Sequence, residues 1–206
     1  MRLIALTGFL VAGLCACDGS LGGGGKTEID VTQDKIRLAG PQGFCIDPRS
    51  VRSSETEAFV MFGNCAAITG SVQSAQPQVQ AVATASVITN SFGTPQVSSA
   101  TKDLTALFST ADGRTALSRS NSAESVAVLD TFVRDGALYL FARDTSPANL
   151  ENAEQTYWRA YFDVGNSLVT VSVIGFEDAP LSRDAGMTTL DQFVRTIRSR
   201  SDTSST

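Results

Sequence analysis

The residues best suited to chemistry in this sequence are the four cysteines, of which Cys15 and Cys17 are separated by a single residue. Two thiols at so short a spacing suit a redox pair, a metal site or a site of covalent processing. The chain contains no histidine. This excludes the Ser-His-Asp and Cys-His catalytic arrangements and the commonest metal ligand. The residues that flank each cysteine must decide which chemistry applies.

The segment before Cys15 has the pattern of an export signal. Arg2 is the only charged residue before Asp18, and residues 3–14 form a mostly apolar run of about 12 residues. This run is shorter than the roughly 20 residues that cross a bilayer, and it is typical of the apolar region of a signal peptide. We therefore expect the chain to be exported, with Cys15 and Cys17 at a processing site.

The segment LCAC, residues 14–17, resembles the bacterial lipobox. In that motif a leucine lies three residues before the modified cysteine and a small residue lies directly before it, as Leu14 and Ala16 do relative to Cys17. The resemblance implies a bacterial lipoprotein whose Cys17 carries a diacylglyceryl group and often a further chain such as palmitate. Several acyl chains attach a protein stably to a membrane, whereas one chain does not. The alternative is a secretory signal that is cleaved nearby without lipidation.

Asp18 directly follows the predicted lipidated cysteine. An acidic residue at this position resembles the inner-membrane retention signal of enterobacterial lipoproteins. The resemblance favours a protein of the bacterial cell envelope that is anchored in the inner membrane and faces the periplasm, with the outer membrane as the alternative.

Cys45 and Cys65 lie outside the predicted signal peptide. In an exported chain, two such cysteines are interpreted first as a disulfide. The chain has no C-x-x-C motif of the thioredoxin type, and without histidine a zinc site would need carboxylates beside the two thiols. We predict a disulfide between Cys45 and Cys65, no metal and no cofactor.

Other candidates for catalysis are explained as well by structural roles. Ser99 and Lys102 form an S-x-x-K sequence, the spacing of nucleophile and amine in penicillin-recognising enzymes. Serine is abundant and the companion motifs have no usable counterpart, so Ser99 is better interpreted as a helix cap. Surface, turn or core positions explain the remaining candidates, which are Glu151, Glu154, Asp130, Asp163, Asp112-Gly113-Arg114, Tyr157, Trp158 and Tyr161. We assign no catalytic residue.

The composition divides the chain into four segments. Residues 1–16 are the lipoprotein signal peptide, and residues 17–34 are the lipidated cysteine and a flexible Gly-rich tether, because four consecutive glycines are costly to order. Residues 35–199 form a single domain, and residues 200–206 form a disordered tail. The net charge of −5 argues against nucleic acid as a partner.

Two hairpins are the clearest structural signals. One turns at Asp135-Gly136, a preferred two-residue turn, and the other at Gly165-Asn166. The first is predicted to pair Val133 with Leu138, Thr131 with Leu140 and Leu129 with Ala142. The second is predicted to pair Phe162 with Val169, Ala160 with Val171 and Trp158 with Val173, which gives one fully apolar face.

The remaining patterns predict the elements that complete the fold. Strands are expected near residues 35–38, 44–46, 58–62 and 78–89, and a short helix over residues 98–109. The many alanines of residues 78–89 leave a helix possible there. A closing helix over residues 181–200 carries one apolar stripe, consisting of Met187, Leu190, Phe193, Val194 and Ile197. We expect an α+β fold, with an antiparallel sheet of about six to seven strands, a C-terminal amphipathic helix and one further helix packed on it.

The order of these elements resembles the PsbP/Mog1-like folds. The stretches GFCIDP, AFVMFGNCAAITG and PLSRDAGMTTLDQFV are similar to uncharacterised exported proteins of alphaproteobacteria. Neither resemblance implies a catalytic residue, because such folds carry many unrelated functions.

The leading functional hypothesis is a lipid-anchored, periplasm-facing envelope protein of non-enzymatic, binding or assembly type, with an envelope protein as its partner. A small-molecule-binding or sensory domain is the second hypothesis, and a hydrolase with carboxylate or Ser-Lys chemistry is the third. A deep pocket with convergent polar groups would favour the second or third, whereas a flat exposed apolar patch would favour the first.

Overall fold

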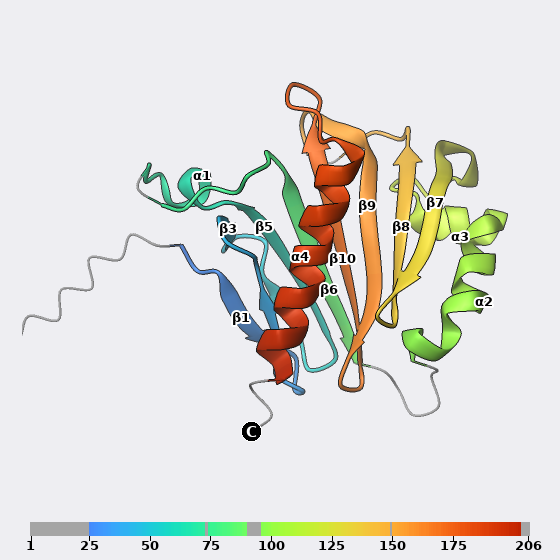
Figure 1. The fold of residues 1–206 in the computed structure, drawn as a ribbon, viewed down its shortest axis with the longest axis horizontal. Helices are drawn as coiled ribbons and strands as arrows, with labels where there is room; N and C mark the ends of the chain where they lie inside the picture. The colour runs from blue at the N-terminus through green and yellow to red at the C-terminus, as the bar shows by residue number, and fades with distance from the viewer. Residues whose placement is uncertain (1–24, 73, 90–95, 149, 203–206) are drawn as a thin grey trace, which may run out of the picture.

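A computed structural model describes residues 25–72, 74–89, 96–148 and 150–202 (Figure 1). Most of these residues belong to strands and helices. The strands are β1 (Glu28–Val31), β2 (Ile36–Ala39), β3 (Phe44–Ile46), β4 (Arg52–Ser53), β5 (Glu57–Asn64), β6 (Val82–Thr89), β7 (Val126–Arg134), β8 (Ala137–Asp144), β9 (Ala153–Val164) and β10 (Ser167–Phe176). The helices are α1 (Cys65–Thr69), α2 (Val97–Ser109), α3 (Ala111–Leu117), the short 3₁₀ turn η1 (Ala123–Ser125) and α4 (Arg183–Asp202).

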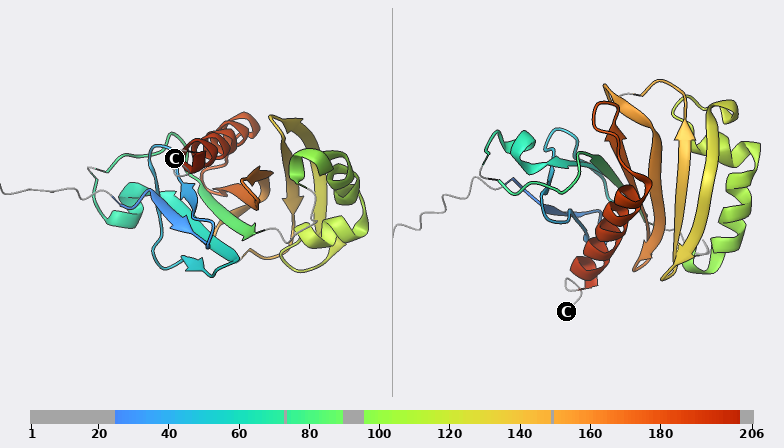
Figure 2. Two further views of the ribbon diagram at one scale, coloured as in Figure 1. Left: turned by 90° about the horizontal axis from the view of Figure 1, so that it is seen from below. Right: turned by 45° about the horizontal axis from the view of Figure 1, so that its top comes forward.

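The main sheet is antiparallel and has eight strands in the described residues, in the order β3-β5-β6-β10-β9-β8-β7 with β4 beside β5. Helix α4 packs on one face, and α2 and α3 pack on the other face over β7–β9 (Figure 2). Alternate residues of one strand therefore enter different cores. On β8, Tyr139 faces the α4 side, whereas Leu138 and Leu140 face α2. The predicted α+β fold is confirmed, with a larger sheet than expected.

The register of the second hairpin is confirmed in all three predicted pairs: Phe162 with Val169, Ala160 with Val171 and Trp158 with Val173. In the first hairpin, the two pairs nearest the turn are also confirmed. The pairing of Leu129 with Ala142 is wrong, because a bulge between Val128 and Asp130 sets Val128 opposite Ala142. The extra residue leaves the Leu129 side chain 50% exposed on the edge strand β7.

The folded domain begins earlier in the chain than the composition predicts. Strand β1 pairs with β2 from Glu28 to Val31, so at least the second half of the expected tether is part of the domain. Val31 is buried, and Arg37 forms an ion pair with Asp30 across the two strands. The alternation in β1 is too short to stand out beside the glycines. At the other end, α4 continues to Asp202, beyond the boundary expected at residue 199.

The helical region between β6 and β7 differs from the prediction in two ways. The cap of α2 is Gln96, not Ser99, and the Asp163 carboxylate on β9 accepts the first backbone N–H groups of the helix, from Val97 and Ser98. A carboxylate supplied by the sheet cannot be predicted from the helix sequence. The segment Asp112-Gly113-Arg114, expected as a turn, lies within α3.

The disulfide between Cys45 and Cys65 is confirmed. Cys45 lies in β3 and Cys65 is the first residue of α1, directly after the neighbouring strand β5. Both residues are buried, and the bond ties the edge of the sheet to α1.

Removing this disulfide is expected to destabilise the domain. The bond closes a loop with a sequence separation of 20, and the chain-entropy model assigns about 3 kcal/mol to a loop of that size. The double variant Cys45→Ser/Cys65→Ser should therefore lose about 3 kcal/mol of unfolding free energy in urea titrations. Two free thiols in the exported wild-type protein, detected by non-reducing mass spectrometry, would contradict the assignment.

Candidate functional site

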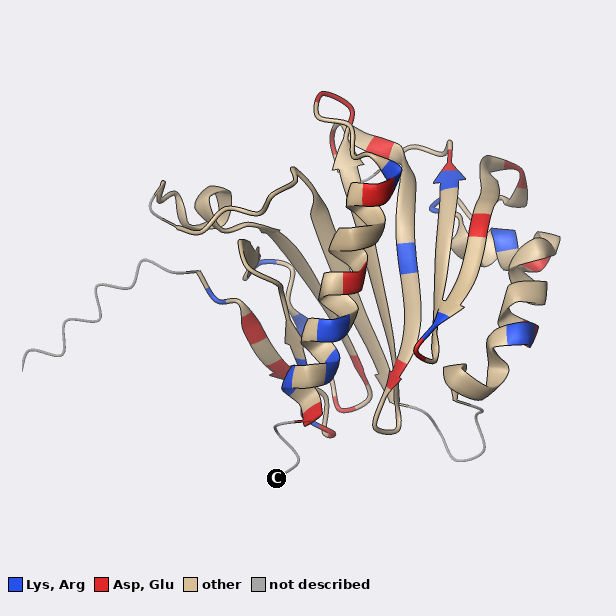
Figure 3. Ribbon diagram, in the orientation of Figure 1, with Lys and Arg blue, Asp and Glu red and all other residues tan. Residues whose placement is uncertain are grey.

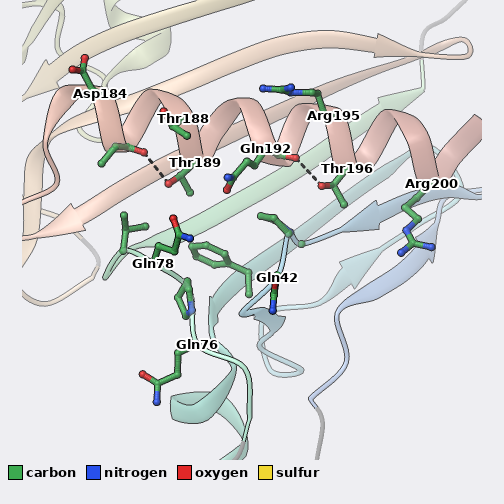
Figure 4. A pocket seen from close by; sticks show the side chains of 16 residues that line it. Gln42, Gln76, Gln78, Asp184, Thr188, Thr189, Gln192, Arg195, Thr196 and Arg200 are labelled. Carbon is green, nitrogen blue, oxygen red and sulfur yellow. Dashed lines mark hydrogen bonds between the residues drawn. The ribbon is translucent and has the colours of Figure 1, made fainter.

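A groove of about 890 Å³ runs along the outer side of α4 and is the candidate functional site (Figure 4). One wall is α4, and the other is formed by the β2–β3 turn and by residues 76–79, called here the 76–79 loop. The groove is lined by Gly40, Pro41, Gln42, Phe44, Gln76, Pro77, Gln78, Val79, Asp184, Ala185, Thr188, Thr189, Gln192, Arg195, Thr196 and Arg200.

The inner face of α4 fixes this helix on the sheet. Its predicted apolar stripe is confirmed, with Leu190, Phe193, Val194 and Ile197 buried and Met187 partly buried. The ring of Phe193 lies edge-on to Phe44, with ring centroids 5.0 Å apart. The same packing makes Phe44 a buried part of the groove floor.

A buried polar network also fixes the orientation of α4 on the sheet. The Asp191 carboxylate of α4 accepts a hydrogen bond of 2.9 Å from the Tyr139 hydroxyl on β8 and forms ion pairs with Arg134 and Arg195. Burial and the hydrogen bond to Asp191 raise the pKa of Tyr139, so the phenol stays a donor. Because a buried carboxylate without its partners is strongly unfavourable, the network holds α4 in one rotational setting.

The position of the opposite wall depends on Gly43. Its backbone has a φ of +90°, and a Cβ atom there would lie 2.2 Å from the backbone nitrogen of Pro77. Only glycine tolerates both this φ and this close approach. Gly43 therefore brings the 76–79 loop against the turn before Phe44 and closes the side of the groove.

Side-chain amides supply the hydrogen-bonding capacity of the groove. Gln192 on α4 and Gln78 on the loop point into the groove from opposite walls, and Gln42 and Gln76 lie at its outer rim (Figure 4). All four are exposed, and the hydrogen bonds found among the described residues involve none of these amides. The Thr189 and Thr196 hydroxyls instead donate to carbonyls of α4 itself. The amides are thus free to donate to and accept from a ligand.

Charge is distributed unevenly along the groove. Asp184 lies in the first turn of α4 and Arg200 in the last, and three of the four arginines of α4 lie in its C-terminal half (Figure 3). Arg195 pairs with Asp191, and Arg200 pairs with Glu28 of β1 at 3.8 Å. The groove therefore has a carboxylate, Asp184, at one end, and the arginines that line its other end are held in ion pairs.

The S-x-x-K candidate has no catalytic geometry. Ser99 and Lys102 are both exposed on α2, and the Ser99 hydroxyl donates to the Gln96 carbonyl of its own helix. The groove on α4 lies on the other face of the sheet.

The acidic candidates from the sequence are not brought together. Asp163 caps α2, Asp130 forms an ion pair with Arg183, and Glu154 accepts the Leu181 backbone N–H at 3.0 Å. Glu151 is exposed. The carboxylates of Asp163, Asp130 and Glu154 thus hold neighbouring segments in place.

The aromatic candidates belong to the two cores. Trp158 is buried against α4, as predicted, and its indole N–H donates to the Arg183 carbonyl. Tyr157 is buried under α3, with its hydroxyl donating to the Leu117 carbonyl at 3.3 Å, and Tyr161 stacks on Phe108. None of the three lines the groove on α4.

The residues of the groove form no catalytic or metal-binding motif, so the sequence did not mark them as a site. The available signal was the alternation of glutamine at positions 76, 78 and 80 around Pro77 and Val79. Cys15, Cys17 and Asp18 lie outside the described residues.

Within the described ranges, no group of three or more acidic or cysteine side chains is placed to hold a metal ion. The helices in those ranges include none that is both long and apolar enough to cross a bilayer.

No protein-family model matches the chain, and no curated protein is significantly similar to it. Among solved structures, the chain is similar to the extracellular domain of PknH from Mycobacterium tuberculosis, with a TM-score of 0.32 and 10% identity. That match covers 74% of this chain and 67% of the other. A likeness at this TM-score supports no inference about function.

Proposed function

We propose that this protein is a lipid-anchored binding protein of the bacterial cell envelope, and that the groove on α4 holds an extended segment of a protein partner. The observation that carries the proposal is the pair of unengaged amides, Gln78 and Gln192, that face the groove from opposite walls. A side-chain amide offers donors and an acceptor at once, which suits the alternating N–H and C=O groups of an extended backbone. The groove contains polar groups suited to binding and lacks a paired nucleophile and base among its lining residues.

The site is a polar groove and not the flat apolar patch expected of the leading hypothesis, and its length along α4 favours an extended segment over a folded surface. From Asp184 to Arg200 the helix rises about 24 Å at 1.5 Å per residue. An extended chain covers that length with about seven residues. The carboxylate of Asp184 favours a basic side chain at that end of the segment.

The proposed anchor is the lipidated Cys17, with Asp18 favouring the inner membrane. The described chain begins at Gly25, eight residues beyond Cys17. Eight residues span at most about 28 Å, so the domain would work close to the membrane surface. We therefore expect the partner to be a protein of the same envelope compartment.

Site-specific photocrosslinking in intact cells tests the proposal. A photoreactive amino acid placed at Gln78 of the full-length chain is expected to give a discrete crosslinked product. The same amino acid at Gln155, an exposed glutamine on β9 outside the groove, is the matched control and should not give that product. Equal crosslinking at the two positions would contradict a binding site in the groove.

A further inference from the structure

The sheet carries a second polar feature on the face opposite α4, centred on Arg159 of β9. The guanidinium lies over the Tyr157 ring, with 5.0 Å from its central carbon to the ring centroid. Its Nε donates a hydrogen bond of 2.8 Å to the Ser172 hydroxyl on β10. The ring contact and the hydrogen bond together fix the orientation of the guanidinium before any ligand binds.

The charge of Arg159 has no counter-charge beside it. The side chain is partly buried, and the ion pairs found in the described part of the chain include none to Arg159. Asp144 acts on it electrostatically, but the Asp144 carboxylate is bound by Arg119 at 3.2 Å. An arginine stays charged in proteins, and a partly buried charge without a partner is costly. A bound anion would remove that cost.

Hydroxyl groups lie beside Arg159 on the β10 side of the same sheet face, whereas Leu140 is its neighbour on β8. The strand register places Ser172 directly opposite Arg159 and Thr84 opposite Ser172. The next row on this face consists of Tyr161, Thr170 and Ser86. Because the Ser172 oxygen accepts the bond from Arg159, its own proton is available to another acceptor. The Ser172 and Tyr161 side chains are hydrogen-bonded to Arg159 itself, and the two central rows contain no carboxylate.

We propose that this patch, defined by Arg159, Ser172, Thr84 and Thr170, binds an oxyanion group, a carboxylate or a phosphate, of a ligand in the envelope. Guanidinium binds both groups in a bidentate manner, and the hydroxyls supply the further donors that an oxyanion requires. This site lies on the other side of the sheet from the groove on α4, so a ligand there would be separate from the proposed protein partner.

Titration of the full-length protein in detergent with simple anions tests the proposal. Inorganic phosphate and acetate are added at constant ionic strength, with chloride as the balancing ion, and binding is followed by the side-chain Nε–H resonance of Arg159. The wild type is expected to show a saturable shift. Tighter binding of phosphate would identify a phosphorylated ligand, and tighter binding of acetate a carboxylate ligand.

Variants separate binding from stability. Arg159→Met should weaken anion binding at least about tenfold, a loss expected for one charge-assisted contact, as judged by anion-dependent stabilisation in thermal unfolding. Arg159→Lys keeps the charge but not the planar donor set and should give an intermediate loss. Arg143→Met removes an exposed arginine from the adjacent strand and should change nothing. An unmoved Arg159 resonance, or equal stabilisation by anions in wild type and Arg159→Met, would overturn the proposal.

Discussion

Cys17→Ser is expected to abolish the incorporation of labelled palmitate into this protein, and Cys15→Ser is expected to leave it intact. The difference follows from the spacing of the lipobox: Leu14 and Ala16 stand at the required positions relative to Cys17 and not relative to Cys15. Removing the acceptor thiol removes every acyl chain, so the effect should be complete rather than partial. Metabolic labelling followed by immunoprecipitation gives the measurement.

Cell fractionation supplies the second readout for the same variants. The acyl chains are the proposed anchor, so a smaller share of Cys17→Ser than of the wild type should fractionate with the membrane. Cys15→Ser should stay in it. Retention of the label in Cys17→Ser, or its loss in Cys15→Ser, would show that the lipobox assignment is wrong.

Asp144→Ala is expected to cause the largest loss of stability among single substitutions of polar residues, about 3 kcal/mol. The carboxylate is fully buried and accepts hydrogen bonds from the Ser146 hydroxyl at 2.6 Å, the Ser146 N–H at 2.9 Å and the Arg119 N–H at 2.8 Å. These bonds join the end of β8 to the segment that follows α3. Alanine leaves the buried donors without an acceptor, and urea-induced unfolding at pH 7 measures the cost.

The same carboxylate should make the stability depend on pH in the acid range. Burial by itself raises the pKa of Asp144, but the hydrogen bonds from Ser146 and Arg119 outweigh it and lower the pKa. A lowered folded-state pKa gives stability that is fully present above the unfolded value of about 4 and is lost as the pH falls toward the folded pKa. The wild type should therefore lose stability below about pH 4, and Asp144→Ala should lose less over that interval.

Asp178→Ala is the matched control, because Asp178 is exposed and its removal leaves no buried donor. It should change the unfolding free energy by less than about 0.5 kcal/mol. If Asp144→Ala proved as stable as this control, the hydrogen bonds to Asp144 could not be holding the two segments together.

Local sequence patterns predicted the elements that are specified by residues close together in the chain. The turn Gly165-Asn166 and the alternation around it specify the second hairpin in full register, and the stripe from Met187 to Ile197 specifies the buried face of α4. The export context correctly paired Cys45 with Cys65. For the hairpin and α4 the deciding contacts are between neighbours in sequence or follow from periodicity. For the disulfide, the chain offers only one pair of cysteines outside the predicted signal peptide and the predicted lipidation site.

The features that were missed depend on residues far apart in the chain. The carboxylate that accepts the first N–H groups of α2 belongs to Asp163 on β9, and the bulge at Leu129 depends on the pairing of β7 with β8. The groove requires Gly43 to admit the 76–79 loop, and it requires α4 to be docked before the glutamines face one another. The periodicity of one segment cannot predict contacts between segments that are far apart in the chain.

An affinity measurement on the crosslinked partner shows whether the groove on α4 binds it. The partner segment crosslinked at Gln78 is synthesised as a peptide, and its dissociation constant is measured for the full-length wild type, for Gln78→Ala/Gln192→Ala and for Gln155→Ala. Loss of two amide contacts should weaken binding by about tenfold or more, at 0.5–1.5 kcal/mol for each hydrogen bond. Gln155→Ala should bind as the wild type does. Equal affinity of the double variant and the wild type would show that the Gln78 and Gln192 amides do not bind the partner.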